Sequence, residues 1–190
     1  MKKLFLIAVL VMLLSSVNGQ DTFTDPRDGN VYRTITVDNR TWMAENLRYK
    51  TTKGTIFFDN DPEYINYGAL YEWKTAINVC PAKWHLPTGE EFQSLIDHFD
   101  QTGSWKGGPT DKSFSIQLGG MQDYEGTFTE MNESAYFWTS TEYDKDNAAY
   151  FSYIMVVKTP VADVSRKDDI QDIRGSEKTN KYSVRCVKDK

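Results

Sequence analysis

Two patterns typical of amphipathic helices follow one another in the middle of the chain. In each, apolar residues recur at intervals of three and four positions, which places them on one face of a helix. The first helix is expected to end at Pro81, because proline lacks the amide hydrogen that a further turn needs. The second is expected to begin at Thr88, which stands three residues before Glu91 as in a capping box. The apolar positions are Leu70, Trp73, Ala76, Ile77 and Cys80 in the first helix and Phe92, Leu95, Ile96 and Phe99 in the second.

Shorter segments rich in β-branched and aromatic residues favour strands. Asp38 and Asn39 are turn residues between the first two segments, which predicts a hairpin, and the polar stretch 142–147 predicts an antiparallel pair of the third and fourth. The strand segments are residues 31–37, 40–47, 135–141, 148–157 and 182–187. The segments expected to be mainly loop, because glycine or charged residues dominate them, are 51–67, 101–122 and 158–181. One short strand is allowed for in 51–67, and short strands or hairpin arms are allowed for in 101–122.

Together these elements predict one domain of the α+β class. We expect two helices packed on a small antiparallel sheet, with long loops on one side and with the first and last strands as neighbours.

The N-terminal residues have the three-part layout of a secretory signal peptide. Two lysines precede the apolar run 4–14, and the small residues Val17 and Gly19 predict cleavage after Gly19. We therefore expect a signal peptide at 1–19 and a single domain at 20–190. No cysteine stands at the cut, so a lipoprotein is not expected. The product is expected in the periplasm, at the cell surface or outside the cell, with no membrane contact once the signal is removed.

The charge balance argues against nucleic acid as a partner. The chain has 22 basic and 27 acidic residues, and removal of Lys2 and Lys3 changes its net charge from −5 to about −7 (20 − 27). Affinity for nucleic acid comes largely from clustered lysine and arginine, whereas the basic residues here are scattered among acidic ones. We expect a solvated acidic surface.

Cys80 and Cys186 are the two cysteines of the sequence. An exported chain matures in an oxidising compartment, so we expect them to pair. Two free, buried thiols are the alternative.

Five motifs occur in a fixed order along the chain. They are WMAENL at 42–47, YGALY at 67–71, CPAKWHLPT at 80–88, FWTSTE at 137–142 and SVRCV at 183–187. In order and wording they resemble the Fibrobacter succinogenes major paralogous domain, over about residues 23–188. That family occurs in exported bacterial proteins and has no established activity, so the resemblance implies architecture more than function.

A more distant likeness links WHLPTGEEF at 84–92 to formylglycine-generating enzymes. Those enzymes have a C-type lectin-like fold, in which a disulfide ties the first helix to the last strand. The likeness therefore implies a C-type lectin-like fold and the pairing of Cys80 with Cys186. It does not imply the enzyme's chemistry, because that chemistry uses a pair of reactive cysteines near the C-terminus and this chain has Cys186 alone there.

Catalytic and metal chemistry find little support in the remaining residues. His85 and His98 lack the spacing of a zinc site or a catalytic triad, and we expect structural or solvated roles for both. Two acidic sets offer oxygen atoms to calcium but lack the EF-hand spacing, so we expect solvated turns, no metal and no cofactor. These sets are Asp59, Asp61 and Glu63, and Asp144 with Asp146.

We expect a non-catalytic recognition module that binds a glycan or a surface protein. Long polar loops on a rigid scaffold suit binding, and the first candidates for ligand contact are Trp105, Asp123 and Tyr124 in the glycine-rich excursion. The alternative is a structural or interaction module of a larger exported assembly.

Overall fold

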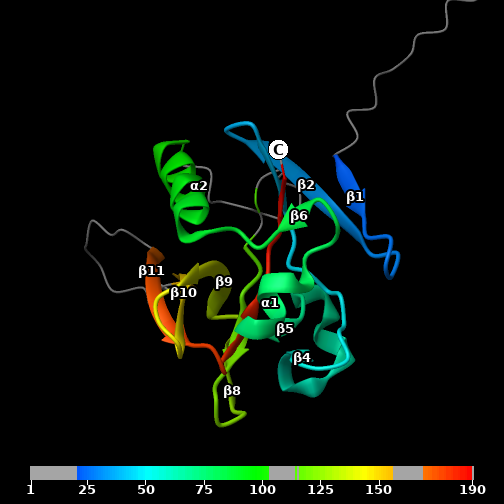
Figure 1. Ribbon diagram of the computed structural model, residues 1–190, viewed down its shortest axis with the longest axis vertical. Helices are drawn as coiled ribbons and strands as arrows, with labels where there is room; N and C mark the ends of the chain where they lie inside the picture. The colour runs from blue at the N-terminus through cyan, green and yellow to red at the C-terminus, as the bar shows by residue number, and fades with distance from the viewer. Residues whose placement is uncertain (1–20, 103–113, 115, 156–168, 190) are drawn as a thin grey trace, which may run out of the picture.

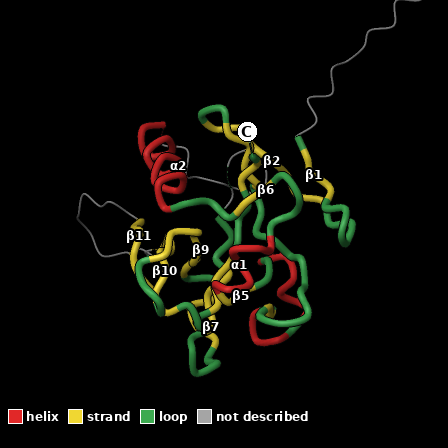
Figure 2. The backbone as a smooth tube through the Cα atoms, viewed as in Figure 1, coloured by secondary structure: helices red, strands yellow, loops and turns green. Residues whose placement is uncertain are grey.

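The computed structural model describes residues 21–102, 114, 116–155 and 169–189. In this part of the chain, thirteen strands form two sheets, and the helices are few and short (Figures 1 and 2). The five-stranded sheet has the order β1 (Thr22–Thr24), β2 (Val31–Val37), β3 (Arg40–Met43), β13 (Val187–Lys188) and β6 (Trp84–His85).

The larger sheet is curled and has eight strands (Figure 1). Its main path is β11 (Asp169–Glu177), β10 (Asn147–Met155), β9 (Ser134–Glu142), β7 (Gly119–Gln122), β12 (Lys181–Ser183), β5 (Leu70–Glu72) and β4 (Thr55–Ile56). The eighth strand, β8 (Phe128–Met131), pairs with β7. The helical elements are η1 (Phe58–Asn60), η2 (Pro62–Tyr67), α1 (Trp73–Val79) and α2 (Gly89–Thr102).

The prediction of an α+β, C-type lectin-like fold with two helices on a small sheet is wrong. The described chain is mostly β, and its two α-helices have seven and fourteen residues. The error arose in segments with weak strand patterns. The expected loop at 158–181 contains β11, which pairs with β10 over its whole length. Strand β7, at the end of segment 101–122, is one of the short strands allowed for there. An edge strand such as β11 has a partner on one side alone, so it tolerates the polar sequence that suggested a loop.

Both predicted strand pairs are confirmed. β2 and β3 form a hairpin whose turn residues, Asp38 and Asn39, have φ angles of 47° and 63°. Two successive positive φ angles are those of the turn that best matches strand twist, and asparagine and aspartate tolerate them. β9 and β10 pair antiparallel through the predicted connection.

The predicted last strand, 182–187, is divided in two. Its first part is β12 in the large sheet, whereas β13 pairs with β3 and β6 in the small sheet. The first predicted strand, β2, is therefore separated from β13 by β3, so the expectation that they are direct neighbours is also wrong.

The predicted start of the helix is more accurate for α2 than for α1. The Glu91 amide donates to Thr88 Oγ1 over 3.1 Å and the Thr88 amide donates to Glu91 Oε2 over 2.9 Å, which confirms the capping box. α1 begins at Trp73 rather than Leu70, because residues 70–72 pair with β12 as strand β5.

Aromatic side chains dominate both clusters of the core. One cluster surrounds Trp138 and Tyr71, and the other surrounds Phe92 and Phe137 beneath α2. The disulfide between Cys80 and Cys186 is confirmed, with an S–S distance of 2.08 Å. It joins the end of α1 to the segment between β12 and β13, and so links the helix to the crossover between the two sheets.

Candidate functional site

Four half-buried aromatic rings from two distant segments form a continuous group. Phe58 of η1 lies 5.5 Å from Tyr64 and 5.2 Å from Phe128 between ring centroids, and Tyr64 lies 6.3 Å from Tyr67. All four side chains are half-buried. We call Phe58, Tyr64, Tyr67 and Phe128 the aromatic surface. Rings held in this way present apolar faces with fixed positions, which is common at binding sites.

Local turn chemistry orients the η1–η2 side of this surface. The Asp61 side chain accepts a hydrogen bond of 2.8 Å from the Glu63 amide at the start of η2, and Pro62 has the φ angle that a helix start requires. The Tyr67 hydroxyl donates to Asn132 Oδ1 over 2.9 Å. That bond attaches η2 to the turn after β8.

Gly120 in β7 provides the space that Phe58 occupies. A Cβ atom at this position would lie 2.9 Å from Phe58 Cε2 and 2.3 Å from the carbonyl oxygen of Thr129. The φ angle of Gly120 is also +60°, a conformation that side chains disfavour. Glycine is therefore needed here both for the close approach of β8 to β7 and for η1 to pack against this hairpin.

The charged residues of the two segments that carry the aromatic surface have one sign. Segment 57–67 contains three carboxylates and segment 121–134 contains four, and neither contains lysine or arginine. A polyanion would therefore be repelled at this surface.

Two of the three predicted ligand residues lie in the turn of the same β7–β8 hairpin. Asp123 Oδ1 accepts from the amides of Glu125 (2.9 Å) and Thr127 (2.8 Å), so this side chain builds the turn. Tyr124 is 64% exposed at the tip. Trp105 lies outside the described residues. Ligand contact by these three residues stays a prediction.

Sequence reasoning missed the aromatic surface itself. Phe58, Tyr64 and Tyr67 belong to a segment expected to be loop, and Phe128 follows about sixty positions later. The available signal was the density of aromatic residues among acidic ones in 57–67. Nothing in the sequence pattern places that segment beside the hairpin.

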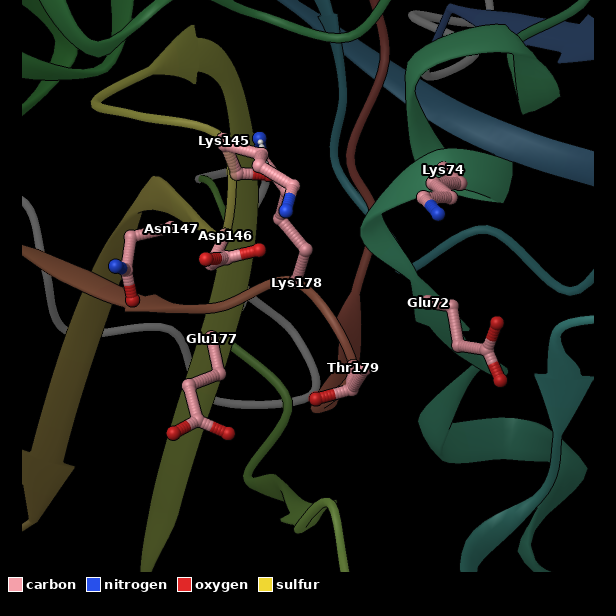
Figure 3. Close-up of a pocket in the computed structure, with 8 residues that line it drawn as sticks. All are labelled: Glu72, Lys74, Lys145, Asp146, Asn147, Glu177, Lys178 and Thr179. Carbon is pink, nitrogen blue, oxygen red and sulfur yellow. Dashed lines mark hydrogen bonds between the residues drawn. The ribbon is translucent and has the colours of Figure 1, made fainter.

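A second candidate is a pocket of about 450 Å³ between the start of α1 and the turns that follow β9 and β11 (Figure 3). We call it the charged pocket. Its lining residues are Glu72, Lys74, Lys145, Asp146, Asn147, Glu177, Lys178 and Thr179. Figure 3 shows Glu72 and Lys74 on one side and the residues of the two turns on the other.

Lys178 fixes the walls of the charged pocket. Its side chain is 7% exposed, and its ammonium donates to the carbonyl oxygens of Asp144 (2.6 Å) and Lys145 (2.8 Å). It also forms an ion pair with Glu142 and lies 4.7 Å from the ring centroid of Trp73. The Lys178 carbonyl accepts a bond of 3.2 Å from the Trp73 amide. One buried residue thus connects α1 to both turns.

Each of the two acidic sets considered for calcium contains one side chain that orders the local backbone. Asp144 Oδ1 accepts from the amides of Asp146 and Asn147, each over 2.8 Å, and hydrogen bonds from Asn147 and Asp146 hold the pKa of Asp144 below its usual value. Asp61 caps η2. Over the described ranges, no group of three histidine, cysteine, aspartate or glutamate side chains is arranged to hold a metal ion.

His85 is held between two carboxylates. Its Nδ1 lies 2.6 Å from Asp189 Oδ1 and its Nε2 lies 3.0 Å from Glu91 Oε2. Burial alone would raise the pKa of Glu91, but hydrogen bonds from Thr88 and His85 and the charge of Arg40 hold it below its usual value. These contacts join β6, α2 and the C-terminal segment, which fits a structural role for His85.

Two residues of the sequence motifs meet in the interior. Asn46 and Arg185 are both fully buried, and the Arg185 guanidinium lies 4.1 Å from the ring centroid of Phe114. Burial lowers the pKa of Arg185 to about 9, although Glu45 opposes the shift. Sequence reasoning missed this pair, since arginine is seldom fully buried.

No helix in the described part of the chain is long and apolar enough to cross a membrane. Comparison with curated proteins and with solved structures gives no match. Among family models, the Fibrobacter succinogenes major domain matches residues 35–188, which include all five sequence motifs. The chain therefore belongs to the Fibrobacter succinogenes major domain family, a family of unknown function.

Proposed function

We propose that the chain is an exported, non-catalytic recognition module that binds an uncharged glycan on the aromatic surface. The observation that carries the proposal is the group of four half-buried rings on two segments without a basic residue.

The chemistry of a sugar ring complements this surface in two ways. Its C–H faces are apolar and pack against flat aromatic rings, while its hydroxyl groups donate hydrogen bonds to carboxylates and amides at the rim. Tyr124 and the carboxylates of 57–67 are exposed beside or near the hairpin that carries Phe128. An acidic glycan is disfavoured because the surrounding charge is negative.

Export is supported by the disulfide and by the charged and apolar layout of the first residues. Structural disulfides form and persist mainly in oxidising compartments. The bond between Cys80 and Cys186 is buried on the Cys186 side, where the residue has no exposed surface.

A large exposed apolar face away from the loops would favour the alternative, a structural module of a larger assembly. Within the described residues, the exposed large hydrophobic side chains belong to different elements, and two of them lie at the aromatic surface or on its hairpin. They are Val31, Ile65, Ile77, Tyr124 and Tyr143. Isolated apolar side chains of this kind are ordinary on protein surfaces.

A glycan array that includes basic peptides tests the proposal. The purified chain is compared with Tyr64→Ala and Tyr124→Ala, and Tyr143→Ala serves as the control because Tyr143 is 54% exposed but lies on the β9–β10 turn. We expect binding to neutral glycans, a loss of roughly tenfold or more in affinity for Tyr64→Ala, and no change for Tyr143→Ala. Binding to basic peptides alone would contradict the glycan assignment. Equal losses in all three variants would contradict the site.

A further inference from the structure

The charged pocket shares none of its lining residues with the aromatic surface. Because its lining is charged and polar rather than aromatic, it suits a different class of ligand. Its frame is rigid before any ligand arrives, because Lys178 is buried and bonded to both the β9–β10 turn and the start of α1. A preformed site avoids part of the entropy cost of ordering side chains and loops on binding.

Some charges of the pocket are neutralised within the protein. Lys178 pairs with Glu142, and Glu72 lies 3.6 Å from the ammonium of Lys181. These groups hold the walls together.

Four other charges in the lining are available to a ligand. Lys74 and Lys145 are exposed cations, and Asp146 and Glu177 are exposed anions. None of the four forms an ion pair with another residue of the described chain. Lys74 stands on the α1 side and the other three stand on the turns (Figure 3). The lining thus has two exposed groups of each sign, with one cation on the α1 wall and the other cation and both anions on the turns.

We infer that the charged pocket binds a short zwitterionic peptide, with ligand carboxylates at Lys74 and Lys145 and ligand ammonium groups at Asp146 and Glu177. Asn147 and Thr179 add amide and hydroxyl groups that suit a peptide backbone. A volume of about 450 Å³ is within the usual range for a small-molecule site.

Ligands of a single charge fit less well. A phosphate or a polyanion would meet Asp146 and Glu177, and a metal cation would meet Lys74 and Lys145. Like charges brought together at a site oppose binding. A neutral ligand would leave all four charges without a partner.

Calorimetric titration of the full chain with the dipeptide lysyl-glutamate tests this inference, since the dipeptide carries two ammonium and two carboxylate groups at neutral pH. The reference ligands are doubly capped dialanine, which has no charge, and inorganic phosphate. We expect saturable binding of lysyl-glutamate that weakens as salt is added, because exposed ion pairs are screened. Stronger binding of phosphate or of the capped peptide would overturn the inference, as would the absence of lysyl-glutamate binding.

Variants of opposite sign test the assignment of the residues. Lys74→Met and Glu177→Gln are each expected to raise the Kd for lysyl-glutamate by about threefold to fivefold, the upper part of the range expected of one exposed ion pair. Lys188→Met is the matched control, because Lys188 is exposed in β13 of the other sheet. Unchanged affinity in both pocket variants, or an equal loss in Lys188→Met, would overturn the site. Circular dichroism verifies that each variant is folded.

Discussion

Arg185 Nε donates a hydrogen bond of 2.9 Å to Asn46 Oδ1, although the two residues are 139 positions apart in the chain. The Asn46 side-chain amide in turn donates to the Tyr67 carbonyl over 2.8 Å and to Ser183 Oγ over 3.3 Å. Both residues belong to sequence motifs, so the motifs meet in one buried polar network. The hydrogen bond to Asn46 offsets part of the free-energy cost of placing a charged group in the interior.

Asn46→Ala is expected to lower the free energy of unfolding by about 2–3 kcal/mol. The substitution removes an acceptor from a buried charged donor, and hydrogen bonds to charged groups are the costly ones to lose. Urea denaturation measures the change. Asn78→Ala, at an exposed position of α1, is the control and should change stability by no more than about 0.5 kcal/mol. Equal effects of the two substitutions would contradict the proposed role of the network.

Loss of the disulfide is expected to cost about 2–5 kcal/mol, because the bond closes a loop over a sequence separation of 106 and restricts the unfolded chain. Denaturation of the double variant Cys80→Ser/Cys186→Ser and of the oxidised chain under the same conditions measures this difference in the free energy of unfolding. Mass mapping without reductant should recover the two cysteines in one linked peptide. Free thiols in freshly exported protein would contradict both the bond and the compartment that it supports.

Alanine substitutions at two glycines distinguish the destabilisation caused by steric overlap from that caused by backbone conformation. Gly29 and Gly120 both have positive φ angles, but a Cβ at Gly29 would meet nothing within 4 Å, whereas one at Gly120 would meet Thr129 and Phe58. Gly29→Ala should therefore cost about 1 kcal/mol from the backbone alone. Gly120→Ala should cost about 2–4 kcal/mol, because overpacking is added. Thermal unfolding of the two variants measures the difference. Similar losses would show that neither Thr129 nor Phe58 lies so close to Gly120.

Stability should fall in acid partly because of Glu91. Its folded pKa lies below the ordinary value of 4.5, so the unfolded state takes up the proton first as the pH falls. The contribution of Glu91 is thus complete above about pH 5 and is lost as the pH falls through the folded pKa. Glu91→Gln should lower stability near neutral pH and make the acid decline less steep. Glu90→Gln, at the exposed neighbouring position, is the control, and an unchanged acid decline in Glu91→Gln would contradict the assignment.

Local patterns predicted the parts of this fold that depend on neighbouring residues. The turn at Asp38 and Asn39, the capping box of Thr88 and Glu91, and the β9–β10 pair are all fixed by short-range chemistry. The disulfide was predictable because two cysteines and an apparent export signal leave one pairing.

The features that the sequence did not predict depend on contacts between segments that are distant in the chain. The sequence of β11 is polar, and its strand conformation is stabilised by backbone hydrogen bonds to the edge of β10. The four rings of the aromatic surface show no distinctive pattern within their own segments. They form one group because η1 packs against the β7–β8 hairpin. Arg185 lay within the last predicted strand and no buried role was predicted for it, whereas in the structure it is buried and bonded to Asn46 from a distant part of the chain.

The most direct test of the proposed recognition role is to map ligand contact by nuclear magnetic resonance. The purified chain is titrated with the neutral glycan that binds best on the array, and backbone and aromatic ring signals are followed. Shifts should concentrate at Tyr64, Tyr67, Tyr124 and Phe128 and should be absent around Arg185, which is fully buried. Shifts confined to another face, or no saturable shift with any glycan on the array, would contradict recognition through the aromatic surface.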